Sequence, residues 1–254
     1  MNQASDMSGK AALVTGAAGG LGRATAVALA KVGADVCVVD INPAGLEETA
    51  ELVRAEQVRC LPCSVDLSTK SACMAVVAET IETFGRLDAL CNVAGVIFFN
   101  HSEAMSEEQW QKTLAVNLSA PFFLSQAAIP HLLEQAGAIV NVSSSAAFIG
   151  EAYAAGYCAT KAGLVNLTKA MAMEYMHKPL RINTVAPGGM MTNIVSSFAS
   201  MPKDLDPGLM ARFKPLRGMV EVDDVANLIA FLASDAASGY HGACVTIDKG
   251  ITAG

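Results

Sequence analysis

The sequence predicts a doubly wound α/β fold, with a mostly parallel sheet of about seven strands and helices on both faces. Short apolar runs alternate with helical patterns along the chain, which is the order of repeated βαβ units. These runs are continuously apolar, as expected for parallel strands buried on both faces. The 254 residues are 52% hydrophobic and contain no linker, repeat or low-complexity tract, so we expect one domain over residues 1–254.

The first five elements alternate strand and helix. Residues 11–16 (AALVTG) form an apolar run that ends at a glycine, and a helical pattern follows at 21–32. The Val-rich run 34–40 (ADVCVVD) predicts the second strand. Residues 43–56 predict a helix, because an Asn precedes a Pro at the first helical position. The next apolar run, 57–66 (QVRCLPCSVD), predicts the third strand.

The middle of the chain continues the same alternation. A helical pattern covers 69–84, and 87–95 (LDALCNVAG) is typical of a strand that runs into a turn. Helices are expected around 106–134, followed by a strand at 138–144 (AIVNVSS). The next helix is expected from 153 to 177.

The last part of the chain completes the predicted sheet. Residues 180–189 (LRINTVAPGG) predict a strand, and 222–233 predict a helix. The closing run 243–248 (ACVTID) predicts the final strand. Between them, residues 190–219 are irregular and rich in Met, including Met190, Met201 and Met210.

Charge and composition exclude several classes of partner. The formal net charge is -7, whereas a nucleic-acid-binding protein usually carries a basic stripe. Residues 113–133 contain no Asp, Glu, Lys or Arg, yet their polar residues and two prolines make a poor membrane helix. We expect that helix to be buried by the protein itself or by a partner subunit. The polar N-terminus MNQASDMSGK lacks the apolar core of a secretory signal.

The seven cysteines are scattered along the chain. Cys60 and Cys63 have the spacing of a metal-binding pair, but no second pair or spaced histidines follow, so we expect no metal site. Free cysteine is among the most buried residue types, and reduced thiols persist in the cytosol. The sequence therefore predicts a cytoplasmic protein with buried thiols.

The stretch TGAAGGLG (15–22) joins the first strand to the first helix. A dinucleotide pyrophosphate binds at such a position, on free backbone N–H groups at the positive end of the helix. Gly16 permits the tight turn, and Gly20 and Gly22 remove side chains where phosphate and sheet come close. With Leu21 they are the predicted cofactor-binding residues of the loop. The other interpretation of the glycine cluster is an ordinary turn between strand and helix.

Asp40 ends the second predicted strand. A carboxylate at this place accepts hydrogen bonds from both adenosine ribose hydroxyls and repels a 2′-phosphate. No Arg precedes Gly20 or follows Asp40, where Ile41 stands. These features predict NAD rather than NADP, with Asp40 and Ile41 at the adenosine end. The other interpretation is that Asp40 only caps the next turn.

In order and spacing, several short motifs of this chain are similar to those of the short-chain dehydrogenase/reductase family, in its short single-domain branch. The resemblance covers nearly the whole chain and implies a Rossmann fold and an NAD(P)-dependent oxidoreductase that acts on CH–OH groups. It also implies a homo-oligomer, usually a tetramer, whose interface we expect from helices 113–133 and 157–177. The motifs are TGAAGGLG (15–22), VDL (65–67), NVAG (92–95), Asn117 in VNLS, Ser144 in NVSSS, YCATK (157–161), PGGMMT (187–192) and IDKG (247–250).

The YCATK motif carries the predicted acid–base chemistry. Hydride transfer to or from a carbinol carbon needs a group that exchanges the hydroxyl proton. Lys161 lies four residues after Tyr157, on the same helix face, and a nearby cation lowers the pKa of a phenol. The other interpretation is an exposed helical Tyr–Lys pair. The resemblance further implies that Lys161 holds the nicotinamide ribose hydroxyls.

Two further catalytic residues are predicted. Ser144 follows the fifth strand, where a hydroxyl can hold the substrate oxygen beside the tyrosine, and the family interval favours it over Ser143 and Ser145. The resemblance implies that Asn117 positions a water behind the lysine, although a helix Asn often only satisfies a backbone group. It also implies these further cofactor contacts: Asp66, Leu67, Asn92, Ala94, Gly95, Pro187, Gly188, Met190 and Thr192.

The Met-rich segment 190–219 indicates the substrate class. Flexible Met-rich segments adapt to apolar ligands, and lids over active sites are often long loops. As a lid it predicts an apolar, cyclic or bulky secondary alcohol, such as a steroid, terpenoid or cyclic diol; as a plain pair of core-covering helices it predicts nothing. A 3-oxoacyl-carrier-protein reductase is disfavoured by Asp40 and the acidic balance. A non-catalytic dinucleotide sensor would not need the Ser–Tyr–Lys set.

Overall fold

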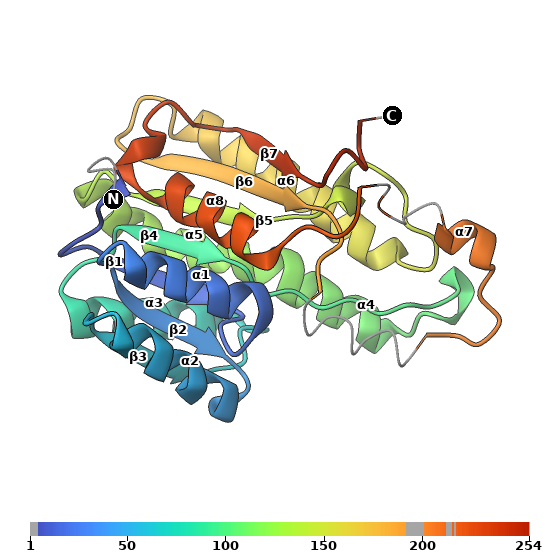
Figure 1. Cartoon of the computed structure of the whole chain (residues 1–254), viewed down its shortest axis with the longest axis horizontal. Helices are drawn as coiled ribbons and strands as arrows, with labels where there is room; N and C mark the ends of the chain where they lie inside the picture. Colours follow the sequence, from blue (N-terminus) through green and yellow to red (C-terminus); the bar gives the residue numbers. More distant parts are fainter. Residues whose placement is uncertain (1–4, 192–200, 212–214, 216, 254) are drawn as a thin grey trace.

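A parallel sheet forms the centre of the computed structural model, which describes residues 5–191, 201–211, 215 and 217–253 (Figure 1). The strand order is β3-β2-β1-β4-β5-β6-β7, and every neighbouring pair is parallel. This confirms the predicted doubly wound class. The strands are β1 Ala11–Thr15, β2 Asp35–Asp40, β3 Cys60–Ser64, β4 Ala89–Asn92, β5 Ala138–Val142, β6 Arg181–Pro187 and β7 Cys244–Ile247.

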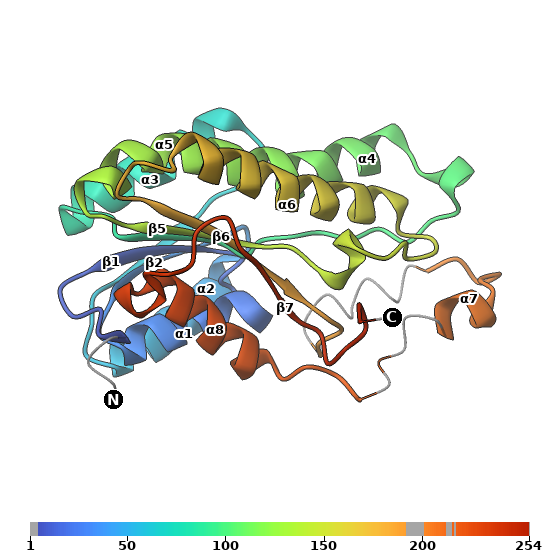
Figure 2. The same cartoon turned by 90° about the horizontal axis from the view of Figure 1, so that it is seen from above.

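Helices cover both faces of the sheet (Figure 2). Helices α1 (Gly20–Lys31), α2 (Pro43–Ala55) and α8 (Val222–Ala233) lie on one face. The opposite face carries α3 (Lys70–Phe84), α4 (Glu107–Leu114), α5 (Ala120–Glu134) and α6 (Ala155–Glu174). The short helix α7 (Pro207–Ala211) lies past one end of the sheet, away from both layers.

Side-chain alternation along the strands divides the core into two layers. In β1, Val14 joins the cluster beneath α1 and α8, whereas Leu13 joins the cluster beneath α3 and α5. In β2, Val38 and Val39 divide in the same way. Because successive strand residues point to opposite faces, strands buried on both sides must be apolar at every position.

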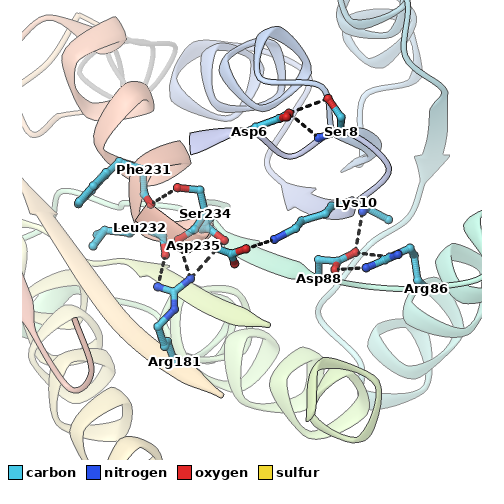
Figure 3. A network of polar contacts seen from close by, with 12 residues as sticks. Asp6, Ser8, Lys10, Arg86, Asp88, Arg181, Phe231, Leu232, Ser234 and Asp235 are labelled. Atoms are coloured by element: carbon cyan, nitrogen blue, oxygen red, sulfur yellow. Dashed lines mark hydrogen bonds and ion pairs between the residues drawn. The ribbon is translucent and has the colours of Figure 1, made fainter. Parts of the chain in front are cut away.

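Polar contacts connect the beginnings of the strands to neighbouring segments at one end of the sheet (Figure 3). The Lys10 ammonium lies 2.6 Å from Asp235, which follows α8, and the Arg86 guanidinium lies 2.7 Å from Asp88. Arg181, at the start of β6, donates to the carbonyls of Leu232 and Ser234 at 2.7 and 2.8 Å. These contacts stabilise the end of the sheet where the strands begin. The opposite end, where the strands finish, remains available for a ligand.

The helical region predicted around 106–134 is interrupted. Helix α4 begins with a capping box, in which the Ser106 hydroxyl accepts from the Gln109 N–H and the Gln109 side chain returns to the Ser106 N–H. A π-helical turn, Ala115–Ser119, then separates α4 from α5. Pro121 has no N–H to donate to the Asn117 carbonyl, so the α-helical ladder cannot continue there. π-helical turns of this kind are frequent at functional sites.

The described residues offer neither a membrane span nor a cluster of metal ligands. None of their helices combines the length and hydrophobicity needed to span a bilayer. Within the same part of the chain, no three or more His, Cys, Asp or Glu side chains are grouped to hold a metal ion. All seven cysteines are free thiols, and the sulfurs of Cys37 and Cys63 lie 3.7 Å apart.

Candidate active site

A cavity of about 420 Å³ opens where β1, β4, β5 and β6 end. The strand order reverses between β1 and β4, and ligands of doubly wound sheets bind at this switch point. The cavity contains most of the predicted site. Thirteen predicted residues line it: Gly16, Gly20, Leu21, Gly22, Asp40, Ala94, Gly95, Ser144, Tyr157, Lys161, Pro187, Gly188 and Met190.

Five of the described predicted residues do not line the cavity. Ile41 is 66% exposed beyond the end of β2, and Leu67 is buried in the core. Asn92 is buried at the end of β4, where its amide donates to the Asn141 side chain at 2.8 Å. Asp66 is paired with Lys112 at 3.1 Å, Asn117 lies behind the cavity wall, and Thr192 lies outside the described residues.

The glycine loop before α1 is tightly packed, so that side chains at Gly16 and Gly22 would clash with neighbouring backbone. Gly16 has φ +69, and a Cβ on it would lie 2.8 Å from the Ala94 Cα. A Cβ on Gly22 would lie 2.0 Å from the Gly16 carbonyl oxygen. Helix α1 begins after Gly19 without a side-chain cap, and its first turn has no acidic residue. The loop thus brings backbone N–H groups to the cavity without steric or charge obstruction, which fits a dinucleotide pyrophosphate.

The Asp40 carboxylate is held at the edge of the cavity by two backbone donors. One oxygen accepts from the Ala18 N–H at 3.2 Å, and the other accepts from the Asn42 N–H at 3.1 Å. Asn42 itself caps α2, because its side chain accepts from the Gly45 N–H. The carboxylate therefore has a fixed position facing the place where an adenosine ribose would lie.

Tyr157 and Lys161 lie on one face of α6, toward the cavity. The Lys161 Nζ is 5.6 Å from the centroid of the Tyr157 ring and donates to the Val142 carbonyl at 2.8 Å. Lys161 is only 3% exposed. A Cβ on Gly95 would lie 3.4 Å from this Nζ, so the absence of a side chain at position 95 leaves room beside the ammonium.

The pKa values differ from the sequence-based prediction. We expected Lys161 to lower the pKa of Tyr157, but the protein raises it to about 12. Burial of the phenol is the main cause, and it outweighs a hydrogen bond with Ser144 that lowers the pKa. Burial also lowers the pKa of Lys161 to about 8. The prediction was wrong because spacing along a helix does not reveal how far both groups are removed from water.

The three serines after β5 have different surroundings. The Ser143 hydroxyl donates to the Lys161 carbonyl at 2.8 Å, which ties β5 to α6. The Ser144 side chain accepts from the Ala146 N–H at 3.2 Å and lies close enough to the Tyr157 phenol to lower the pKa of that phenol. Ser145 is buried at the start of a 3-10 turn, Ser145–Ala147. Of the three, Ser144 is the one whose hydroxyl affects the pKa of the phenol.

Asn117 lies in the π-helical turn and is fully buried. Its Oδ1 accepts from the Val96 N–H at 2.8 Å, and its Nδ2 donates to the Val96 carbonyl at 2.9 Å. Nδ2 also lies 3.2 Å from the Thr160 hydroxyl. The side chain therefore fixes the loop after β4 against α6, just behind Lys161.

The cavity also contains residues that the sequence-based prediction missed. Glu151 lies six residues before Tyr157, in the loop that leads into α6, and its position beside that motif was the only signal for it in the sequence. Most of the others directly neighbour predicted residues in the same motifs or, like Val142, end a strand, and the rest come from loops. They are Ala18, Gly19, Asn42, Val93, Ile97, Phe99, Val142, Ser143, Ser145, Gly189 and Met219.

Comparison with known proteins shows the family of this chain. Residues 16–252 match the family described as "Enoyl-(Acyl carrier protein) reductase". The chain is 35% identical to D-threitol dehydrogenase of Mycolicibacterium smegmatis, over 97% of this chain and 94% of that protein. It is 36% identical to the 2,5-dichloro-2,5-cyclohexadiene-1,4-diol dehydrogenase LinX of Sphingobium indicum, over 99% of each. It is 35% identical to the 3-oxoacyl-[acyl-carrier-protein] reductase FabG of Staphylococcus aureus, over 95% and 98%.

Solved structures agree with the fold over the whole chain. A short chain dehydrogenase from Mycobacterium paratuberculosis bound to NAD has a TM-score of 0.90 at 28% identity and covers 98% of this chain and 100% of that one. A protein from Agrobacterium tumefaciens with bound NADP has a TM-score of 0.86 at 30% identity, over 100% of both chains. The matching family, the full-length relatives and the fold show that this chain belongs to the short-chain dehydrogenase/reductase family of NAD(P)-dependent oxidoreductases.

Proposed function

We propose that this protein is an NAD-linked dehydrogenase that interconverts a secondary alcohol and its ketone, with Ser144, Tyr157, Lys161 and Asn117 as its catalytic set. The observation that carries the proposal is the phenol of Tyr157, which faces the switch-point cavity beside Ser144 and has the Lys161 ammonium 5.6 Å from its ring. A bound nicotinamide supplies or accepts the hydride.

The protein groups handle the proton. With its pKa raised by burial, Tyr157 is a neutral phenol at pH 7 and is ready to donate to a ketone oxygen. Ser144 holds that oxygen beside the phenol. For alcohol oxidation the phenol must become a base, and positive charge in the cavity, from Lys161 and from an oxidised nicotinamide, favours its ionisation.

Asn117 would act through its backbone rather than its amide, which is fully engaged with Val96 and Thr160. Because Pro121 has no N–H, the Asn117 carbonyl lacks the α-helical partner it would otherwise have. We propose that this carbonyl holds a water behind Lys161 and so connects the site to solvent.

Replacement of the phenol tests the catalytic assignment. Tyr157→Phe removes the exchangeable proton, so we expect turnover to fall by at least about 10²-fold while NADH binding stays within a few fold. Initial rates and NADH fluorescence titration measure the two effects. Tyr175→Phe, at the other end of α6, is the matched control and should keep normal rates. Full activity of the Tyr157 variant would refute the assignment.

The choice of NAD rests on Asp40. Its carboxylate is fixed at the cavity edge by the N–H groups of Ala18 and Asn42, where it would repel a 2′-phosphate. We expect Asp40→Ser to raise kcat/KM for NADP and to lower it for NAD. Steady-state rates with both cofactors measure the change, and a wild-type protein that prefers NADP would contradict the proposal.

The proposed substrate is an apolar or cyclic secondary alcohol. Ile97, Phe99 and Met190 line the cavity. Met201, in the described part of segment 190–219, packs against the cluster of Ile97, Phe99 and Ala154. We propose this segment as a lid, although its residues 192–200, 212–214 and 216 lie outside the described part of the chain. Two of the relatives are named as dehydrogenases of a polyol and of a cyclic diol, which supports the same class.

A second candidate is a 3-oxoacyl-carrier-protein reductase, because FabG is among the relatives. The net charge of -7 and the Asp40 carboxylate argue against an acidic carrier protein and NADP. A panel of cyclic secondary alcohols and one 3-oxoacyl thioester, each with both cofactors, decides between the two by following reduced-cofactor absorbance.

We also propose a homo-oligomer, a tetramer by resemblance, whose interface includes α5 and α6. Phe122 on α5 is 38% exposed and Met173 on α6 is 67% exposed, and residues 113–133 carry no Asp, Glu, Lys or Arg. Apolar helix faces of this kind are typical of subunit interfaces. Light scattering at micromolar concentration tests this, and a monomer would contradict it.

A further inference from the structure

Glu151 is held in a fixed place beside the proposed acid–base residue. It lies in the loop between the 3-10 turn Ser145–Ala147 and helix α6. Its N–H donates to the Cys158 sulfur at 3.3 Å, and its carbonyl accepts from the Ala154 N–H at 3.2 Å. Cys158 directly follows Tyr157, so the first turn of α6 sets the position of both Glu151 and the phenol.

The Glu151 side chain lines the cavity that contains Tyr157 and Ser144. Much of the surrounding wall is apolar, with Ile97 and Met190 among its residues. Burial raises the pKa of Glu151, and the Glu151 carboxylate is close enough to Tyr157 for its charge to raise the pKa of the phenol. The carboxylate thus belongs to the reaction chamber rather than to the outer surface.

Unlike other carboxylates near the site, Glu151 has no protein partner within the described part of the chain: no ion pair or hydrogen bond to its side chain is found there. Asp40 accepts from two backbone N–H groups, and Asp248 accepts from the N–H groups of Gly250 and Thr252. Asp66 is paired with Lys112. A half-buried carboxylate without a donor is unfavourable, so a bound ligand that supplies a donor gains affinity.

We infer that Glu151 accepts a hydrogen bond from a second hydroxyl group of the substrate, which makes the substrate a diol or polyol rather than a simple secondary alcohol. This inference rests on the proposed dehydrogenase function. A neutral hydroxyl fits better than an amine, because an ammonium group would meet the positive charge of Lys161 in the same cavity. No proton or electron is transferred at Glu151; the residue selects and orients the substrate.

The experiment compares two probes that differ by one hydroxyl, cyclohexane-1,2-diol and cyclohexanol, with wild type, Glu151→Leu and Glu151→Gln. A hydrogen bond to a charged group predicts that wild type favours the diol in kcat/KM by about 10- to 100-fold. Glu151→Leu should lose this preference, mainly through a higher KM for the diol, so that its kcat/KM values for the two probes become alike at the same pH. Glu151→Gln retains an acceptor oxygen and should keep part of the preference.

Glu174→Leu at the far end of α6 is the matched control and should leave the diol preference unchanged. Circular dichroism and melting temperature verify that each variant is folded. Equal loss of both substrates in Glu151→Leu, or a wild type that does not distinguish the probes, would overturn the role of Glu151 while the proposed function stands. Turnover of neither probe with either cofactor would overturn the proposed function and this inference with it.

Discussion

Lys161 is predicted to destabilise the fold in which it acts. Burial lowers the pKa of Lys161 from 10.5 to about 8, and at about 1.36 kcal/mol per pKa unit the buried ammonium costs about 3 kcal/mol. Lys161→Met removes this cost but also removes the hydrogen bond to the Val142 carbonyl, which contributes about 1–2 kcal/mol. We therefore expect the Lys161→Met variant to be more stable than wild type by about 1–2 kcal/mol at pH 7.

The pH dependence gives this prediction its sign. Below pH 8 Lys161 is protonated in both the folded and the unfolded chain, so the full cost of burial is present. Between about pH 8 and 10.5 the folded state has lost the proton and the unfolded state still binds it, so wild-type stability rises with pH. The advantage of the variant should shrink across this window.

Urea denaturation at pH 7 and pH 9.5, at equal protein concentration, measures both effects. Lys169→Met, an exposed position on the same helix, serves as the control and should show no such pH-dependent gap. A Lys161 variant that is less stable than wild type at pH 7, or a gap that stays constant at pH 9.5, would refute the reasoning.

Two further substitutions test the loop and the edge of the sheet. Gly22→Ala places a Cβ 2.0 Å from the Gly16 carbonyl oxygen, so we expect the free energy of unfolding in urea to fall by at least about 2 kcal/mol and NADH to bind more weakly. The control Gly85→Ala, with φ +78 but open space around it, should lower the free energy of unfolding by about 1 kcal/mol and leave NADH binding intact. Equal behaviour of the two variants would argue against the clash at Gly22. Arg181→Met removes the donors to the last carbonyls of α8, so we expect the free energy of unfolding to fall by about 2–4 kcal/mol while kcat at 20 °C stays unchanged. A changed kcat would show that the end of the sheet where the strands begin affects the active site.

The fold was predictable because its rules are local. Parallel strands buried on both faces need apolar residues at every position, and the runs at β1 and β2 satisfy this directly. The glycine loop was predictable for a similar reason, since Gly22 lies where a side chain would collide with the Gly16 carbonyl. Each of these constraints involves only a few residues that are close together in the sequence.

The parts that could not be predicted depend on packing between distant segments. The pKa of Tyr157 follows from burial, which is set by the loops that cover α6. The position of Glu151 depends on the contact between its loop and Cys158. The π-helical turn at Asn117 depends on Pro121 together with the contacts that the Asn117 amide makes to Val96. No periodicity in the sequence reports these contacts.

The π-helical turn has a consequence for how this enzyme can be altered. One added residue rotates the following part of a helix by about 100°, so α4 and α5 present different faces than an unbroken helix would. Leu124 and Leu132 of α5 can then pack on the sheet while Asn117 still reaches the loop after β4. Deleting one residue to make this helix regular would rotate α5 relative to α4. Either the leucines of α5 would turn away from the sheet or Asn117 would no longer reach the loop after β4. A designer who shortens or idealises the region would have to choose between a well-packed core and an intact active site.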